Sequence, residues 1–107
     1  MHFKTTQTFD KQAKKLAKKY PNLKNDLVTF INGFEQLHLS ATQIKKAIYK
    51  IRIKNSDKNK GKSAGYRVYY YLVHEETLYM LTIYDKSQIE MIDETYLDQI
   101  IQEEIED

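Results

Sequence analysis

The sequence predicts an α+β fold in which two N-terminal helices and a C-terminal helix pack on a twisted antiparallel sheet. Apolar residues recur at helical spacing before residue 38, alternate or cluster as in strands between residues 48 and 84, and return to helical spacing after Lys86. Segments of one type follow each other instead of alternating strand by helix, which is typical of α+β proteins. Because the chain has 107 residues and no repeats, we expect residues 1–107 to form one domain.

The N-terminal residues predict a strand followed by a helix. Residues 2–7 are rich in threonine and include a phenylalanine, a composition that favours a strand. Thr8 or Asp10 is expected to cap the helix that follows. The apolar positions of that helix fall at helical spacing, with lysines on its other face: Ala13, Leu16, Ala17 and Tyr20.

A second helix is expected between residues 21 and 38. Pro21 suits its first turn, and apolar residues follow at steps of three or four up to His38. The dipeptide Asn32-Gly33 lies inside this pattern and weakens its regularity. Residues 40–46 are compatible with either a further helical turn or a loop.

Three strands and a final helix are expected after residue 47. Residues 48–54 alternate between apolar and charged side chains, residues 65–73 form a β-branched and aromatic run, and residues 78–84 follow a turn at 74–77. A helix with a break near Asp93 is then marked by apolar residues at helical spacing, namely Ile89, Ile92, Tyr96, Leu97, Ile100, Ile101 and Ile105.

The charges are divided unequally along the chain. The first 74 residues carry 16 of the 17 Lys and Arg and four acids, a net charge of +12, whereas the remaining residues carry Lys86 and 11 acids, a net charge of −10. This division favours a polyanionic partner for the first part. The acidic tail either folds back on that part or contacts another molecule.

Several classes of protein are excluded or disfavoured. The chain has no cysteine, so it has no disulfide, thiolate metal site or cysteine nucleophile. Its three histidines are far apart and lack ligand spacing, and the phosphate-loop pattern GxxxxGK[ST] is absent, so we expect neither metal nor cofactor. There is no apolar run long enough for a membrane span and no apolar N-terminal segment like that of a secretory signal, so we expect a cytoplasmic protein.

The cations of residues 48–54 occupy alternate positions of a strand. Lys50, Arg52 and Lys54 therefore share one face, while Tyr49 and Ile51 point to the other. Three neighbouring cations repel each other, and a polyanion or nearby acids would stabilise them. Lysines that protect an edge strand from aggregation explain the pattern equally well.

A second group of candidates surrounds Arg67. This arginine lies early in a strand, where its guanidinium can hold a phosphate with two hydrogen bonds. Tyr69 and Tyr71 share its face and either stack on unpaired bases or pack within the protein. Lys86 follows the end of the third strand, with Tyr84 in phase. The further candidates for RNA contact are Lys58, Lys60 and Lys62 in the lysine-rich loop and Tyr96 in the last helix.

Three segments together resemble the RelE/ParE superfamily of bacterial toxins. They read YKIRIKN, GKSAGYRVYYYLV and LYMLTIYDKS, and the opening FKTTQTFDKQAKKLAKKYP is similar as well. The nearest resemblance is to the RelE/HigB-like mRNA endonucleases, the toxins of type II toxin–antitoxin systems. It implies a RelE-like fold, and cleavage of ribosome-bound mRNA by attack of a ribose 2′-OH on the neighbouring phosphate, without a histidine pair.

The resemblance also implies roles for single residues. Lys50, Arg52 and Lys54 match the basic strand positions, Arg67 matches the arginine that holds the phosphate, and Lys86 matches a candidate general acid. Arg52 stands where the best-known member has a lysine base, and arginine does not readily accept a proton, so Lys50 or Lys54 would take that role. Ile92 stands near the position of a stacking tyrosine, so either Tyr84 or Tyr96 replaces that tyrosine or stacking on a base is absent.

Two other functions share these features. One is inhibition of DNA gyrase of the ParE type without nuclease activity, since the same fold serves both activities. The other is a non-catalytic relative that binds RNA or a protein partner. All three functions imply a cognate antitoxin, which either covers the basic sheet or displaces the C-terminal helix, and the nuclease also implies the ribosome and mRNA as partners.

Overall fold

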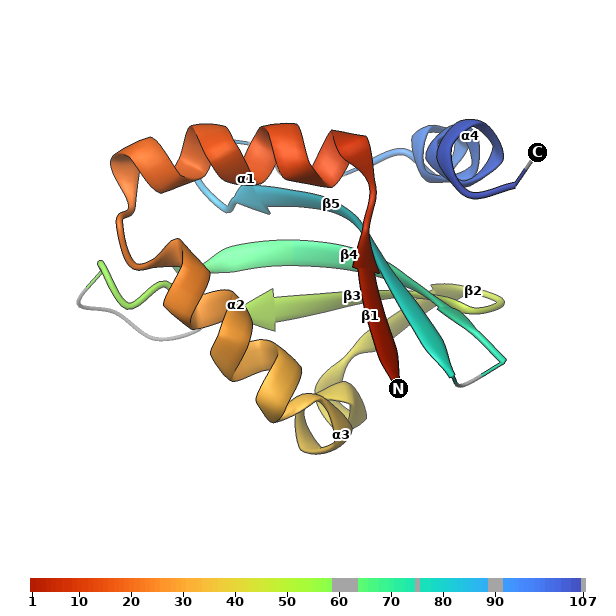
Figure 1. Ribbon diagram of the computed structural model, residues 1–107, viewed down its shortest axis with the longest axis horizontal. Helices are drawn as coiled ribbons and strands as arrows, with labels where there is room; N and C mark the ends of the chain where they lie inside the picture. Colours follow the sequence, from red (N-terminus) through yellow and green to blue (C-terminus); the bar gives the residue numbers. More distant parts are fainter. Residues whose placement is uncertain (59–63, 75, 89–91, 107) are drawn as a thin grey trace.

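The computed structural model describes residues 1–58, 64–74, 76–88 and 92–106. It has an α+β architecture in which helices pack on a mixed sheet (Figure 1). The elements in chain order are β1 (His2–Thr5), α1 (Gln7–Lys19), α2 (Leu23–Asn32), α3 (Phe34–Leu37), the 3₁₀ turn η1 (His38–Ser40), β2 (Thr42–Lys45), β3 (Ile48–Ile53), β4 (Tyr66–Val73), β5 (Thr77–Asp85) and α4 (Glu94–Glu104).

The sheet has five strands in the order β1-β5-β4-β3-β2. Strands β2 to β5 pair antiparallel, but β1 runs parallel to β5, so the prediction of a wholly antiparallel sheet is wrong at this edge. The reason is that β1 meets β5 only after the chain has formed the helices and three other strands. No tight turn joins the two strands, and no hairpin therefore imposes an antiparallel direction.

The first helix begins earlier than predicted. Thr6 is its cap in place of Thr8 or Asp10, and the Thr6 hydroxyl accepts a hydrogen bond from the Phe9 amide at 3.0 Å. The same hydroxyl donates to the Leu81 carbonyl at 2.8 Å, and Thr6 is buried. Thr6 therefore ends β1, starts α1 and ties both to β5.

The second predicted helix is divided at Gly33. α2 ends at Asn32 and α3 begins at Phe34, so the helix does not run unbroken to His38. The Gly33 amide donates to the Thr29 carbonyl at 3.0 Å, and the change of direction places the Phe34 ring in the core. Pro21 lies in the turn that precedes α2, outside its first turn.

Residues 42–45, which were compatible with a helical turn or a loop, form the edge strand β2. A tight connection through Ala47, which has a φ of 66°, joins β2 to β3. At the C-terminus, α4 begins after Asp93, whose carboxylate accepts a hydrogen bond from the Thr95 amide at 2.9 Å. Ile89 of the predicted helix lies outside the described residues.

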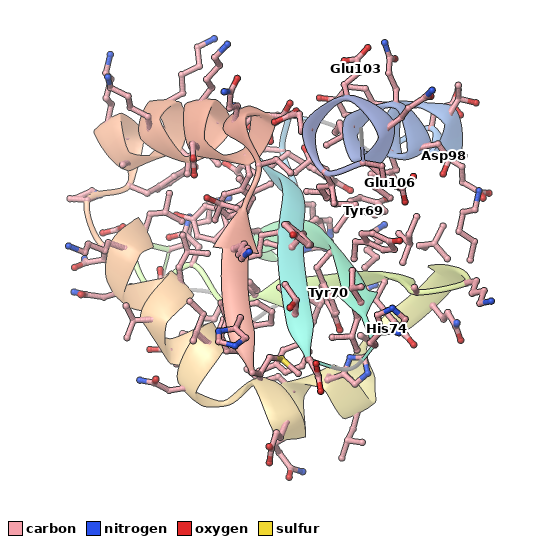
Figure 2. All side chains as sticks on the ribbon, turned by 45° about the vertical axis from the view of Figure 1, so that its right-hand side comes forward. Tyr69, Tyr70, His74, Asp98, Glu103 and Glu106 are labelled. Carbon is pink, nitrogen blue, oxygen red and sulfur yellow. The ribbon has the colours of Figure 1, made fainter. Side chains whose placement is uncertain are left out.

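Each face of the sheet has its own hydrophobic cluster. Figure 1 shows α1 and α2 across one face, where Phe9, Leu16 and Phe30 pack with Val68 and Tyr70. The cluster that includes α4 joins residues of the other face with one side of that helix: Ile48, Tyr69, Leu81, Tyr84, Leu97, Ile100 and Ile101. Figure 2 shows Tyr69 beside α4.

The acidic C-terminal region folds back on the rest of the chain. The Glu104 carboxylate accepts hydrogen bonds from the Gln7 and Thr8 amides and the Thr8 hydroxyl, at the positive N-terminal end of α1. Asp98 forms an ion pair with Lys45 at 3.0 Å. In the described part of the chain, no helix is both long and apolar enough to cross a bilayer.

A buried carboxylate anchors the end of β5. Asp85 is 1% exposed and accepts hydrogen bonds from Tyr20 and Lys58, each at 2.6 Å, and from the Ser87 hydroxyl at 3.0 Å. Burial alone would raise the pKa of Asp85, but the hydrogen bonds from Lys58, Tyr20 and Ser87 outweigh it and lower the pKa below its usual value.

We predict that Asp85→Asn lowers the free energy of unfolding by about 1–3 kcal/mol at neutral pH, the range for hydrogen bonds to a charged group. The folded carboxyl has a lower pKa than the unfolded one, so its stabilisation is present above about pH 4 and is lost as the pH falls through the folded pKa. Urea denaturation at pH 7 and pH 3 should therefore show a deficit that shrinks in acid. An equal deficit at both pH values contradicts the assignment, and the exposed Glu35→Gln is the control.

Candidate nucleic-acid interface

The pairing of the three long strands places two arginines and a tyrosine in one row. Arg52 of β3 lies opposite Arg67 of β4, and Arg67 lies opposite Tyr84 of β5. Residues that face each other across paired strands share a face of the sheet. Residues 52, 67 and 84, which are far apart in the sequence, therefore lie side by side on one face of the sheet.

Two lysines extend this row along β3. Lys50 lies opposite Tyr69, and its ammonium is 5.7 Å from the centre of that ring. Arg52 and Lys54 are exposed, whereas the alternating residues Ile51 and Ile53 are buried in the cluster on the opposite face. Lys50, Arg52 and Arg67 thus lie beside Tyr69 and Tyr84 on this part of the sheet.

Arg67 lies deep in the face. It is 5% exposed, and its Nη1 is 3.4 Å from the Tyr66 carbonyl and 3.5 Å from the Gly65 carbonyl. Burial and the neighbouring Arg52 charge lower the pKa of Arg67, opposed by Tyr84 and Asp85, but an arginine remains protonated. Arg67 is therefore a fixed cation beside a second cation, and an anion bound between them would relieve their repulsion.

Gly65 brings two further cations to the same end of the strands. The Lys86 amide donates to the Gly65 carbonyl at 3.2 Å, just beyond the pair formed by Tyr66 and Asp85. Lys54 follows Ile53, which pairs with Tyr66. Lys54 and Lys86 therefore directly follow β3 and β5, the two strands that flank β4, and both are exposed. A side chain at Gly65 would overlap the Ile53 carbonyl oxygen, so a glycine is required for this close approach.

The predicted stacking tyrosines are mostly covered. Tyr69 and Tyr84 are 2% and 3% exposed, and their rings lie 6.2 Å apart and pack with α4. Tyr71 is partly buried, and its hydroxyl is 3.4 Å from Glu106. Tyr96 is 37% exposed on α4, and Ile92 packs against the same cluster. In this conformation Tyr69 and Tyr84 serve as core residues.

The hydroxyl of Tyr84 is buried beside the arginines. Within the described residues it has no hydrogen-bond partner. Burial and then Tyr69 raise its pKa, while Arg67 acts in the opposite direction, so the phenol stays protonated at neutral pH.

Lys58, the described lysine of the lysine-rich loop, is engaged away from this face. Lys58 is bound to Asp85 and to the Ala64 carbonyl at 2.9 Å, and its ammonium is 5.4 Å from the Tyr20 ring, which belongs to the α1 side of the sheet. The pairing with Asp85 raises the pKa of Lys58 despite its burial. Lys60 and Lys62 lie outside the described residues.

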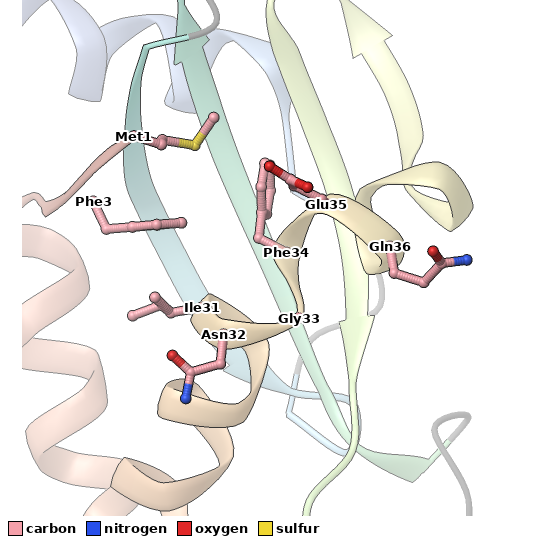
Figure 3. A pocket seen from close by; sticks show the side chains of 8 residues that line it. All are labelled: Met1, Phe3, Ile31, Asn32, Gly33, Phe34, Glu35 and Gln36. Atoms are coloured by element: carbon pink, nitrogen blue, oxygen red, sulfur yellow. The ribbon is translucent and has the colours of Figure 1, made fainter.

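A hollow elsewhere on the molecule has a different character. Figure 3 shows it between β1 and the junction of α2 and α3, with Met1, Phe3 and Phe34 in its lining. Its volume is about 470 Å³, and Glu35 is the charged residue among those that line it. Since the charged side chain of this lining is an acid, the sheet face, with its several cationic side chains, suits a phosphate better.

No protein-family model matches this sequence, and no curated protein matches it either.

We predict that Gly65→Ala destabilises the protein by about 1–3 kcal/mol, because the new methyl group overlaps the Ile53 backbone. Gly33→Ala is the matched control, since its nearest neighbours would lie at 3.4 Å and its φ is −103°. Urea denaturation of both variants measures the difference. Similar unfolding free energies would show that the strands do not approach as closely at Gly65 as described.

Proposed function

We propose that this chain is an endoribonuclease toxin of the RelE/ParE superfamily, part of a type II toxin–antitoxin system. In this proposal it cleaves ribosome-bound mRNA and so inhibits translation. The observation that carries the proposal is the cationic face formed by Lys50, Arg52, Lys54, Arg67 and Lys86, with Arg52 and Arg67 directly opposite each other. The sequence resemblance to RelE/HigB-like toxins supports the same conclusion.

Attack of a 2′-OH on the adjacent phosphate places three demands on a site. The hydroxyl loses a proton, negative charge grows on the non-bridging oxygens, and the leaving 5′ oxygen gains a proton. Arg52 and Arg67 are suited to the second demand, because two guanidiniums in one row can bind both non-bridging oxygens. Lys50 or Lys54 would accept the proton, and Lys86 would donate the other.

The positions of the histidines favour this lysine-based scheme over a histidine pair. His38 lies against the opposite cluster, with its Nδ1 2.5 Å from the Tyr70 hydroxyl. His2 belongs to β1, and His74 follows the far end of β4. All three histidines lie in the described part of the chain, and none of them is in the Arg52–Arg67–Tyr84 row.

The proposed partners follow from the same surface. With Tyr69 and Tyr84 covered by α4, the exposed cations can bind a phosphate, but few surfaces remain to orient the bases. This arrangement favours a substrate that the ribosome holds in place, and hence action in the cytoplasm. The cognate antitoxin would present acidic residues to the cationic face or displace α4.

We predict that Arg52→Ala lowers the rate of mRNA cleavage about 100- to 1,000-fold, the effect of removing one group that stabilises transition-state charge. The assay is primer extension on mRNA from a reconstituted translation reaction with purified protein. Because Arg52 is exposed, its truncation should leave the fold intact. Lys24→Ala, which removes an exposed cation from α2, is the control and should cut like the parent.

Two outcomes would contradict the proposal. Cleavage by Arg52→Ala and Lys86→Ala at the parental rate would show that the cationic face is not the catalytic site. Growth arrest without mRNA cleavage, together with inhibition of gyrase supercoiling, would instead favour a ParE-type inhibitor.

A further inference from the structure

A second basic surface lies where α1 crosses the end of β5. β1 pairs with β5 only from Thr77 to Met80, so α1 rather than a strand borders the later part of β5. Between them is a groove of about 290 Å³. Its lining residues come from α1, from β5 and from the turn after β5: Gln12, Lys15, Leu16, Lys19, Ile83, Tyr84 and Gln88.

The polar groups that line this groove are mostly donors. The Gln12 side-chain oxygen accepts hydrogen bonds from the Thr82 hydroxyl at 2.7 Å and the Ile83 amide at 2.9 Å. The Gln88 side-chain oxygen accepts from the Asp85 amide at 3.2 Å. Both oxygens are occupied, which leaves the two NH₂ groups, and neither has an acceptor among the residues that the structure describes.

The charges of the groove point to an anion. Lys15 and Lys19 are exposed, stand one helical turn apart, and contribute two ammonium groups. No acid is among the residues that line the groove. Two cations and two amide donors above the apolar floor of Leu16 and Ile83 suit a phosphate group attached to a larger molecule.

The groove and the cationic face share one residue. Tyr84 lines the groove and also belongs to the row with Arg52 and Arg67. Lys86 lies in the chain between Tyr84 and Gln88. A strand of nucleic acid that has one phosphate at the arginines can therefore pass around the end of β5 towards α1.

We propose that this groove binds a phosphate of the RNA backbone next to the scissile one, held by Lys15, Lys19 and the amides of Gln12 and Gln88. This inference rests on the proposed function, because it takes the RNA bound at the arginines as its starting point. It assigns to α1 a role in substrate binding beyond its packing on the sheet. The groove would make binding depend on RNA length.

The test measures the binding of 2′-O-methyl oligoribonucleotides, which lack the attacking hydroxyl and so stay intact. Fluorescence anisotropy compares a dinucleotide and an octanucleotide over a range of salt concentrations. The variant is Lys15→Ala/Lys19→Ala. The matched control is Lys14→Ala/Lys18→Ala, which removes two exposed lysines at the same spacing on α1 but outside the groove.

We expect Lys15→Ala/Lys19→Ala to weaken octanucleotide binding about tenfold and to reduce the slope of log K against log salt by about 0.7, the value for one phosphate of a single strand that is no longer neutralised. Dinucleotide binding should change less than about twofold, and the control should retain most of the parental slope.

The inference is overturned if both double variants lose the same affinity, or if the parent binds the octanucleotide no better than the dinucleotide. Cleavage in the reconstituted translation reaction is scored separately. If the parent cleaves mRNA but the two double variants lose the same affinity for RNA, the inference about the groove is wrong and the proposed nuclease activity stands. Groove-dependent binding without cleavage supports the groove as a phosphate site and refutes the proposed nuclease.

Discussion

The pairing of Arg52 with Arg67 sets two like charges against each other at the centre of the sheet. Like charges directly opposite in a sheet are unfavourable by roughly 0.2–1 kcal/mol. A shift of one residue in β3 would separate them, but it would also turn Ile51 and Ile53 away from the core. Burying each of these side chains is worth about 1.5–3 kcal/mol, so the hydrophobic pattern of one face maintains the charge repulsion of the other. This arrangement favours binding of an anion by Arg52 and Arg67, because the two cations are already in position before the anion binds.

The acidic C-terminal region limits how much of that face is open. α4 covers Tyr69 and Tyr84 and is held by Glu104 at the start of α1 and by Asp98 at Lys45. Glu104 and Asp98 are thus engaged with other elements, and Arg52, Lys54 and Lys86 remain exposed. The strongly unequal distribution of charge along the chain thus yields two separate surfaces, with the cationic one at the end of β5.

Features of the fold were predictable where apolar and charged residues repeat regularly along the sequence. Alternation in residues 48–54 predicted which side chains of β3 face the core, because a half-buried strand repeats every two residues. The parallel pairing of β1 and the strand β2 were not predictable, because no turn or marked alternation signals them. The helix cap was placed too late because Thr5, Thr6 and Thr8 are all close to the helix start, and only the contact of Thr6 with Leu81 distinguishes them.

For the candidate site, too, the features that depend on neighbouring residues were predictable, and those that depend on distant contacts were not. The alternating cations and the glycine before Arg67 are local signals, and the strand register brings them together. The burial of Tyr69 and Tyr84 could not be predicted from their neighbours in the sequence, because the helix that covers them, α4, is distant in the chain. In the same way, Lys58 looked like a free loop lysine, but its partner Asp85 is 27 positions away. The spacing of residues in the first helix indicates only that its lysines lie opposite its apolar residues, whereas the structure shows that Lys15 and Lys19 line a groove beside β5.

The measurement that tests the central claim most directly is the chemical identity of the RNA ends after cleavage. Mass spectrometry of the fragments from a short mRNA cut on ribosomes distinguishes the possible mechanisms. Attack by the 2′-OH on a phosphate held by Arg52 and Arg67 predicts a 2′,3′-cyclic phosphate on one fragment and a 5′-OH on the other. A 3′-OH with a 5′-phosphate would contradict the account, because those ends require attack by water instead of the neighbouring hydroxyl.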